Sequence, residues 1–532
     1  MIRDGKIWIA NNENGEPIYV LPGMANRHGL VAGATGTGKT ITLKVLSETF
    51  SDMGVPVFLA DVKGDIASIM YPGTDSADMQ ARIQRFGLAE HGFNYEGYPV
   101  TLWDIYGEKG IPLRSTISEI GPLLLSRILD LNDLQRDILS IVYKIADDNN
   151  LLLVDTKDLK SMLNYVKANA KDYADQYGRI ASASVDAIMR ALVALESEGA
   201  DKFFGEPALN INDWLTVGAG GKGMINVLDS ESLINSGRLY STFLLWLLSE
   251  LFEAMPEVGD LDKPKMVFFF DEAHLLFNGC PKVLLDKIEQ VVKLVRSKGV
   301  GVYFCTQNPK DIPDGVLSQL GNKIQHGLRA YTPSDQRAVK AAAESFRVNP
   351  AFNTYDTILA LGTGEAVVSF LDEKGIPTVC EKAYILPPKS RMGSISDTER
   401  ENAIKGALAY SRYANAVDPD SAYEFLQRKG LEEAEALEQA MKEAEEAKVK
   451  AAEEKEAAKL AAKEAAAAEK EKQRAANAAK SAAKSVSSTV AGTVGREAGK
   501  LLGKKFGSFG KTLGGNVGAA LGRGIIGTLF KR

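Results

Sequence analysis

The chain has 532 residues, 45% of them hydrophobic, so it can bury a large core and form more than one domain. Its three cysteines, Cys280, Cys305 and Cys380, lack CxxC or CxxH spacing, which argues against a disulfide framework and a zinc site. The first twenty residues mix charged, polar and short apolar stretches, so we expect no signal peptide or membrane span there, and a cytoplasmic location.

The formal net charge of −6 is unevenly distributed. Residues 481–532 contain nine Lys or Arg against one acid, Glu497, which gives this stretch +8 and leaves −14 for the remainder. Nucleic-acid phosphates bind clustered cations, and an acidic body does not offer them broadly. Any nucleic acid is therefore expected to contact local patches or a lined channel.

Alternation at 7–10 and 17–21 predicts a short N-terminal hairpin. Continuous apolar runs then predict strands of a mostly parallel sheet that is buried on both faces and alternates with helices, which makes the fold class α/β. These runs lie at 29–32, 55–60, 224–228, 266–270, 300–305 and 366–370.

Between 115 and 205, apolar residues recur at helical spacing and predict a helical insertion whose apolar stripes form a core. Residues 431–480 are dominated by Ala, Glu and Lys, which predicts a long solvated helix without a coiled-coil seam. We therefore expect five segments: 1–114 and 206–395 as two parts of one core, the insertion 115–205, the long helix 396–480 and the tail 481–532.

In the tail, glycines recur every four residues from Gly495 to Gly507 and from Gly510 to Gly522. On a helix they would form small-residue stripes that allow close helix packing, beside basic and apolar stripes. Self-association, a peripheral membrane anchor, contact with nucleic-acid phosphates and a flexible tail all stay open.

The segment GATGTGKT fills every fixed position of the phosphate-binding pattern GxxxxGK[ST], between an apolar run and an amphipathic helix. Its glycines let backbone N–H groups surround phosphates at a helix N-terminus. This predicts a site for ATP and Mg²⁺ in which Lys39 reaches the terminal phosphates and the Thr40 hydroxyl ligates the metal. The predicted nucleotide-binding residues are Gly33, Ala34, Thr35, Gly36, Thr37, Gly38, Lys39 and Thr40.

Asp271 and Glu272 directly follow the apolar run 266–270, at the strand end where α/β sheets bind ligands. We expect Asp271 to hold Mg²⁺ through water and Glu272 to orient and deprotonate the attacking water. Gln307 follows the next run and is expected to sense the γ-phosphate, to hold that water, or only to cap the strand.

The segment ADVKGD places Asp61, Lys63 and Asp65 after the run 55–60. It predicts either a nucleotide or partner contact, or a charged turn. His274 either couples nucleotide state to a neighbouring loop or only packs. His28 and His326 are expected to be ordinary surface or packed residues.

The chain resembles the HerA/FtsK superfamily of ring-forming ATPases, most closely its bacterial HerA-helicase-like branch. The motifs that carry the resemblance span about residues 1–390 and are GATGTGKT, ADVKGD, FFFDEAHLLF, RSKGVGVYFCTQNPKDIP and QLGNKIQHGLRAYTPSDQ. The resemblance implies a RecA-like core with an additional catalytic strand, a hexamer with ATP at its subunit interfaces, and translocation on double-stranded DNA.

In that family an arginine of the neighbouring subunit completes the site, and the resemblance implies Arg296 or, second, Arg329 for this role. Either could instead form a surface or interface ion pair. About thirty residues precede the phosphate loop, so we expect neither the β-barrel of HerA helicases nor the nuclease that docks on it. Nothing suggests the winged-helix DNA reader of FtsK motors.

The leading functional hypothesis is thus an ATP-driven DNA translocase or helicase. The alternative is a nucleotide-dependent assembly or membrane-associated ATPase that does not move on DNA. A P-loop kinase is disfavoured, because Glu272 beside Asp271, together with Gln307, suits the activation of water.

Overall fold

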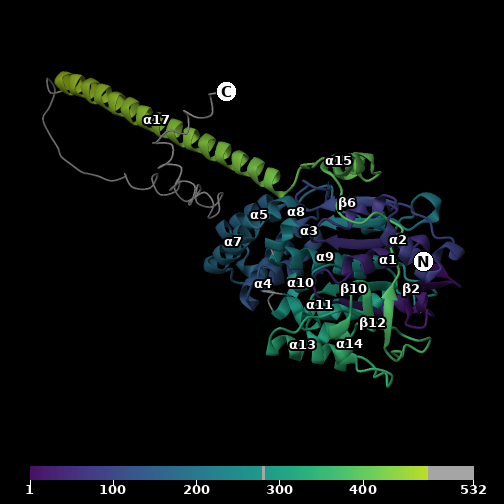
Figure 1. Ribbon diagram of the computed structural model, residues 1–532. Coiled ribbons are helices and arrows are strands. Elements are labelled where there is room, and N and C mark those ends of the chain that lie inside the picture. The colour runs from purple at the N-terminus through teal and green to yellow at the C-terminus, as the bar shows by residue number, and fades with distance from the viewer. Residues whose placement is uncertain (236, 260, 278–281, 477–532) are drawn as a thin grey trace. The chain divides into compact units, whose positions relative to one another are not determined.

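The computed structural model describes all residues except 236, 260, 278–281 and 477–532 (Figure 1). The chain forms two compact units. The first comprises Met1–Tyr143, Leu153–Thr156 and Ala187–Pro419, and the described part of the second comprises Lys144–Leu152, Lys157–Asp186 and residues 420–476. The Gly-rich tail predicted at 481–532 lies outside the described residues.

The first unit is built on a 13-stranded sheet that is mostly parallel. The pairs of neighbouring strands from β11 to β7 in the spatial order are all parallel. The pairs from β1 to β11 are all antiparallel. The order is β1 (Ile2–Arg3), β2 (Lys6–Asn12), β13 (Glu381–Ile385), β12 (Glu365–Ser369), β11 (Asn322–His326), β4 (Gly29–Ala32), β10 (Val300–Thr306), β9 (Met266–Phe270), β5 (Val57–Asp61), β8 (Ile225–Asp229), β6 (Val100–Asp104) and β7 (Ile111–Pro112), with β3 (Pro17–Val20) paired to β2.

Strands β4, β5, β8, β9 and β10 are buried along their whole length, so helices and loops cover both faces of the sheet, as predicted. On one face Phe269 and Tyr303 pack near Phe50 of helix α1 (Lys39–Asp52). On the other, Phe58 packs near Phe243 of α9 (Gly237–Ala254). Strand β9 thus contributes aromatic side chains alternately to two cores, because Phe268 and Phe270 lie near Phe58.

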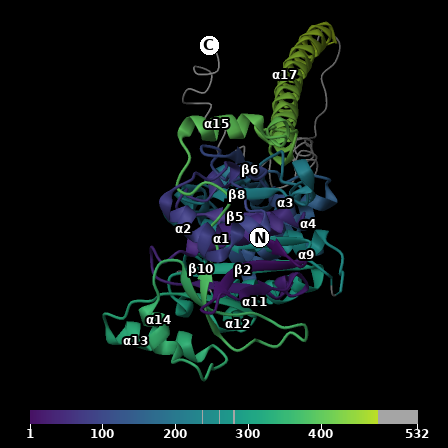
Figure 2. The same cartoon turned by 45° about the vertical axis from the view of Figure 1, so that its right-hand side comes forward.

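The run at 366–370 differs from the expected parallel arrangement, because β12 is antiparallel to both β11 and β13. The connection from β11 to β12 contains α13 (Pro333–Glu344) and α14 (Thr354–Ala360), which contact each other (Figure 2). β12 begins at the sheet edge where β11 ends. The chain therefore returns in the opposite direction. The N-terminal hairpin, β2 with β3, is present as predicted.

Helices occupy most of the region 115–205, as its apolar spacing predicted. They are α3 (Ile117–Ile128), α4 (Asp133–Asp148), α5 (Thr156–Ala168), α6 (Ala174–Tyr177), α7 (Ser182–Ser197) and α8 (Ala200–Phe203). The other helices besides those above are α2 (Ala77–Phe86), α10 (His274–Phe277), α11 (Lys282–Val295), α12 (Asp314–Leu317), α15 (Asp397–Gly406), α16 (Tyr410–Tyr413) and α17 (Ala422–Ala476).

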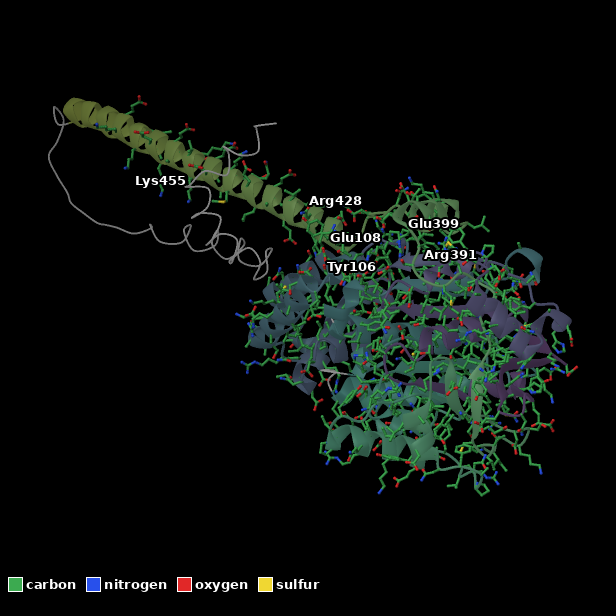
Figure 3. All side chains as sticks on the ribbon, in the orientation of Figure 1. Tyr106, Glu108, Arg391, Glu399, Arg428 and Lys455 are labelled. Atoms are coloured by element: carbon green, nitrogen blue, oxygen red, sulfur yellow. The ribbon has the colours of Figure 1, made fainter. Side chains whose placement is uncertain are left out.

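The long helix expected within 396–480 is α17, with 55 residues. Arg428 and Lys455 on this helix are exposed (Figure 3), and Glu438 pairs with Lys442 one turn later. None of the helices in the described part of the chain has both the length and the apolar composition needed to cross a bilayer.

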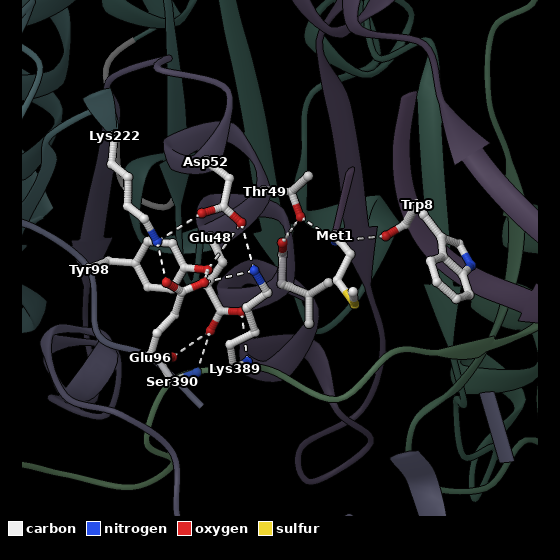
Figure 4. Close-up of polar contacts among 11 residues, drawn as sticks. Met1, Trp8, Glu48, Thr49, Asp52, Glu96, Tyr98, Lys222, Lys389 and Ser390 are labelled. Carbon is white, nitrogen blue, oxygen red and sulfur yellow. Dashed lines mark hydrogen bonds and ion pairs between the residues drawn. The ribbon is translucent and has the colours of Figure 1, made fainter. Parts of the chain in front are cut away.

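A buried polar network holds α1 against the segment after β13 (Figure 4). Glu48 accepts hydrogen bonds from the backbone N–H groups of Lys389 (2.9 Å) and Ser390 (3.0 Å). Lys389 Nζ also lies 3.0 Å from Asp52 and 2.8 Å from Glu96. The far end of the helix that follows the phosphate loop is therefore held to the segment after β13 by hydrogen bonds and an ion pair.

Candidate nucleotide site

The phosphate-binding pattern forms the turn between β4 and α1, as its sequence context predicted. Its three glycines, Gly33, Gly36 and Gly38, have positive φ angles of 156°, 78° and 114°, which L side chains rarely adopt. Lys39 is buried, and its Nζ donates to the carbonyl oxygens of Gly33 (2.6 Å) and Ala34 (3.1 Å). The lysine therefore lies over the cradle of the loop.

His326, at the end of β11, packs against the phosphate loop at Gly33. A Cβ atom at Gly33 would lie 2.5 Å from the His326 Cβ, so the two backbones approach closely. The ring nitrogens of His326 pair with Thr42 Oγ1 (2.9 Å) and the Glu365 carbonyl (2.9 Å). Burial lowers the pKa of His326 to about 4, so this buried residue is neutral at physiological pH.

Asp271 and Glu272 follow β9 at the same sheet edge. Both are almost completely buried. Asp271 Oδ2 has no hydrogen-bond partner among the residues that the structure describes. Burial and the neighbouring Glu272 charge raise the pKa of Asp271 above its usual value.

Glu272 is the centre of the polar contacts at this edge. Lys63 Nζ lies 2.5 Å from its Oε1, Gln307 Nε2 donates to both of its oxygens at 3.2 Å, and His274 Nδ1 lies 3.3 Å from Oε2. Burial opposes ionisation, but the hydrogen bond and charge of Lys63 outweigh it, so the pKa of Glu272 is lowered. Glu272 is therefore held as a carboxylate.

Gln307 is exposed and directly follows β10, which pairs with β4 on one side and β9 on the other. The strand that carries Gln307 thus lies between the phosphate-loop strand and the strand of Asp271 and Glu272. The order β4, β10, β9 agrees with the additional strand that the resemblance implied.

Asp61 ends β5 and organises the segment ADVKGD. Its carboxylate accepts hydrogen bonds from the N–H groups of Lys63 (3.2 Å), Gly64 (2.8 Å) and Ile66 (2.9 Å). Burial, with the nearby charge of Asp65, raises the pKa of Asp61 to about 7. The sequence could suggest that this segment lies at the site, but not that Lys63 pairs with Glu272.

The two candidate arginines lie in different places. Arg296 is exposed and precedes β10, at the amino edge of the parallel sheet. The seven residues of β10, at about 3.3 Å each, separate it from the phosphate-loop edge by roughly 20 Å. Arg329 is exposed at the phosphate-loop edge and donates to the carbonyl oxygens of Leu328 (3.4 Å) and Leu359 (3.2 Å).

Thr40 and the unpartnered Asp271 oxygen fit the oxygen ligands that Mg²⁺ prefers. The described residues contain no cluster of three or more His, Cys, Asp or Glu side chains that could hold a metal. A cation here would therefore take its remaining oxygen ligands from phosphates and water, as Mg²⁺ commonly does.

A pocket of about 180 Å³ opens beside the start of α1. Its walls are largely apolar and come from α1, from α2, from the turn before β12 and from the segment after β13. The residues that line it include Gly38, Ile41, Met79, Arg82, Gly364 and Met392.

The chain matches the family described as Helicase HerA-like C-terminal over residues 6–529. It belongs to that family. This HerA-like chain is 24% identical over 355 residues to the DNA double-strand break repair helicase HerA of Sulfurisphaera tokodaii, an alignment that covers 64% of this chain and 62% of that protein. It is 23% identical over 379 residues to the protein of the same name from Sulfolobus acidocaldarius, with coverage of 69% and 66%. The HerA-like chain thus spans less than two thirds of the length of either relative.

Among solved structures, the HerA-like chain is similar to the plasmid coupling protein TrwB in complex with the ATP analogue ADPNP, with a TM-score of 0.49 and 14% identity over 70% of this chain and 87% of that one. It is also similar to VirB4 of Thermoanaerobacter pseudethanolicus, with a TM-score of 0.44 and 17% identity over 72% and 97%.

Proposed function

We propose that this HerA-like chain hydrolyses ATP and uses the hydrolysis to move along double-stranded DNA as a ring-shaped oligomer. The observation that best supports hydrolysis is that the phosphate loop, Gln307 and Glu272 follow the adjacent strands β4, β10 and β9 at one sheet edge. A carboxylate and a carboxamide beside a phosphate cradle suit the activation of water.

In this proposal the loop N–H groups and Lys39 bind the phosphates, because they supply donors and positive charge at a helix N-terminus. Glu272 accepts the proton of the attacking water, and Gln307 orients that water. Thr40 and, through water, Asp271 would hold Mg²⁺, which would supply charge that neutralises the terminal phosphates. The adenosine part enters the 180 Å³ pocket, which begins at Gly38 and Ile41.

An arginine from the neighbouring subunit would complete the site. Because Arg296 lies at the amino edge of its own sheet, it can act only on a neighbour's nucleotide. Arg329 lies on the phosphate-loop edge, so it is the alternative if the ring brings another surface to the site. Loss of the acting arginine should reduce turnover more than nucleotide binding.

Movement on DNA is supported by family membership and by the two relatives named as DNA double-strand break repair helicases.

The test is steady-state ATP hydrolysis with and without double-stranded DNA of increasing length, with Glu272→Gln as the background control. We expect severalfold stimulation that grows with DNA length, because a motor leaves short fragments quickly. Sedimentation with and without nucleotide would measure the mass of the oligomer and thus its number of subunits.

A rate of ATP hydrolysis that does not change with DNA of any length would contradict the proposed movement on DNA. It would leave the proposed ATP hydrolysis unaffected. Oligomers that form only with nucleotide, or lipid binding, would then favour the assembly or membrane-associated function.

A further inference from the structure

Lys63 connects the protein surface to the buried carboxylate of Glu272. The Lys63 side chain is 39% exposed, whereas that of Glu272 is 4% exposed, and their charged atoms lie 2.5 Å apart. Most ion pairs of an exposed lysine contribute little to the stability of the fold. This one is different because its acidic partner is the group that must receive a proton from water.

The backbone beside Lys63 is fixed, so only its side chain is free to move. The buried Asp61 carboxylate binds the N–H groups of Lys63, Gly64 and Ile66, and thereby ties the loop to the end of β5. Four methylene groups still allow the ammonium to swing away from the carboxylate. The Lys63–Glu272 ion pair can therefore open without movement of the sheet.

In the observed arrangement both lone pairs of Glu272 Oε1 receive a hydrogen bond, one of them from the Lys63 ammonium. Oε1 receives hydrogen bonds from Lys63 and Gln307, and Oε2 receives one from Gln307. A general base must direct a lone pair at the proton that it removes. Oε1 of Glu272 can do so only after Lys63 withdraws.

We propose that Lys63 is a positioning residue that withholds Glu272 from the attacking water until a phosphate group competes for its ammonium. This inference rests on the proposed ATP hydrolysis. The competing phosphate belongs either to the DNA backbone or to the nucleotide itself, and both offer the anionic oxygens that bind an ammonium ion.

The test is Lys63→Met in the full chain, which keeps most of the length of the side chain and removes its charge. We expect kcat without DNA to rise severalfold. If the DNA backbone is the competing phosphate, the KM for ATP should stay unchanged, because Lys63 follows β5 and is not part of the phosphate loop. Lys63→Arg should restore the low rate. A kcat that falls or stays unchanged would overturn the proposal.

The two phosphate sources give different results with DNA. If the DNA backbone releases Glu272, Lys63→Met turns over rapidly without DNA and loses its stimulation. If the nucleotide releases it, the variant is faster but keeps the stimulation seen for the wild type. A faster variant of a protein that DNA never stimulates would support the positioning role and contradict the DNA motor.

Two further variants exclude a trivial effect. The double variant Lys63→Met/Glu272→Gln should be as slow as Glu272→Gln alone, since the gain acts through that carboxylate. Lys310→Met removes another exposed lysine, which follows β10 at the same sheet edge, and it should leave the DNA-free rate unchanged. A gain that survives the double substitution, or that Lys310→Met reproduces, would count against Lys63.

Discussion

The backbone of Glu272, as well as its contacts, determines where its carboxylate lies. Its φ angle of 45° falls in the left-handed region, which costs free energy for a residue with a side chain. This turn directly after β9 brings the carboxylate to Lys63 and Gln307, which lie on the two flanking strand ends. The local strain is therefore associated with the group that we propose as the base.

Glu272→Gln should bind ATP and lower kcat by about 10²- to 10⁴-fold, the usual contribution of a general base. Glutamine has nearly the same shape but cannot accept the proton. Steady-state hydrolysis and binding of a fluorescent ATP analogue measure the two effects separately. Lys39→Ala is the matched control, because it should lose binding as well. Wild-type turnover by Glu272→Gln would remove Glu272 from the proposed mechanism.

At the residue scale, the sequence could predict only what lies within a continuous motif. The residues of GATGTGKT and the pair Asp271 and Glu272 each follow an apolar run, so their sheet edge could be inferred. The contact of Lys63 with Glu272 joins positions 209 residues apart and depends on strand order. The packing of His326 under Gly33 likewise requires β11 to lie beside β4.

At the element scale, the 180 Å³ pocket depends on segments that are distant in the sequence. Met79 and Arg82 come from α2, Gly364 precedes β12, and Met392 follows β13. The buried network around Glu48 ties this last segment to α1. The phosphate loop and the outer wall of the pocket are therefore fixed to the same helix.

Met392→Trp should raise the KM for ATP by about tenfold, equivalent to ~1.4 kcal/mol, with kcat maintained. The Met392 side chain is 48% exposed, so the larger ring can be accommodated without disturbing the core, while it fills the pocket. Leu408→Trp, at a position 92% exposed, is the matched control. If Met392→Trp leaves the KM for ATP unchanged, the adenine ring of ATP does not occupy this pocket.

Apart from the N-terminal hairpin, strand existence could be predicted where a strand is a continuous apolar run, and not elsewhere. The runs that became β5, β8, β9 and β10 are continuous and apolar, which is typical of buried strands. β11 lacks such a run, because its buried Asn322, Gln325 and His326 are polar. Their hydrogen bonds to backbone groups make this burial acceptable, and a sequence does not reveal them.

At the scale of the whole molecule, the second unit joins segments that a linear division keeps apart. Asp158 accepts hydrogen bonds from the Ser421 hydroxyl (2.6 Å) and the Tyr423 N–H (2.8 Å). Lys429 Nζ donates to the Tyr165 hydroxyl at 2.8 Å. Composition suggested that the region 115–205 and the long helix were different segments, but it carries no information about which segments pack together.

The stability of the first unit should depend on pH through His28. This ring joins two elements, since Nδ1 accepts from the Val302 N–H (3.0 Å) and Nε2 pairs with the Val292 carbonyl (2.9 Å). Burial, with the nearby positive charge of Arg296, lowers the pKa of His28 to about 4. The unfolded chain binds a proton there near pH 6.5, so acid favours unfolding between pH 6.5 and 4.

His28→Gln should remove this dependence. The difference in unfolding free energy between the wild type and His28→Gln should shrink by about 2 kcal/mol from pH 7 to pH 5, because protonation penalises only the wild-type fold over that interval. Denaturant unfolding at both pH values measures it, and the variant comparison cancels the opposite effect of buried carboxyls such as Asp61. Met392→Trp, which changes no histidine, should keep the wild-type pH dependence. An equal pH dependence in the wild type and His28→Gln would mean that the folded protein admits a charged ring between β10 and α11.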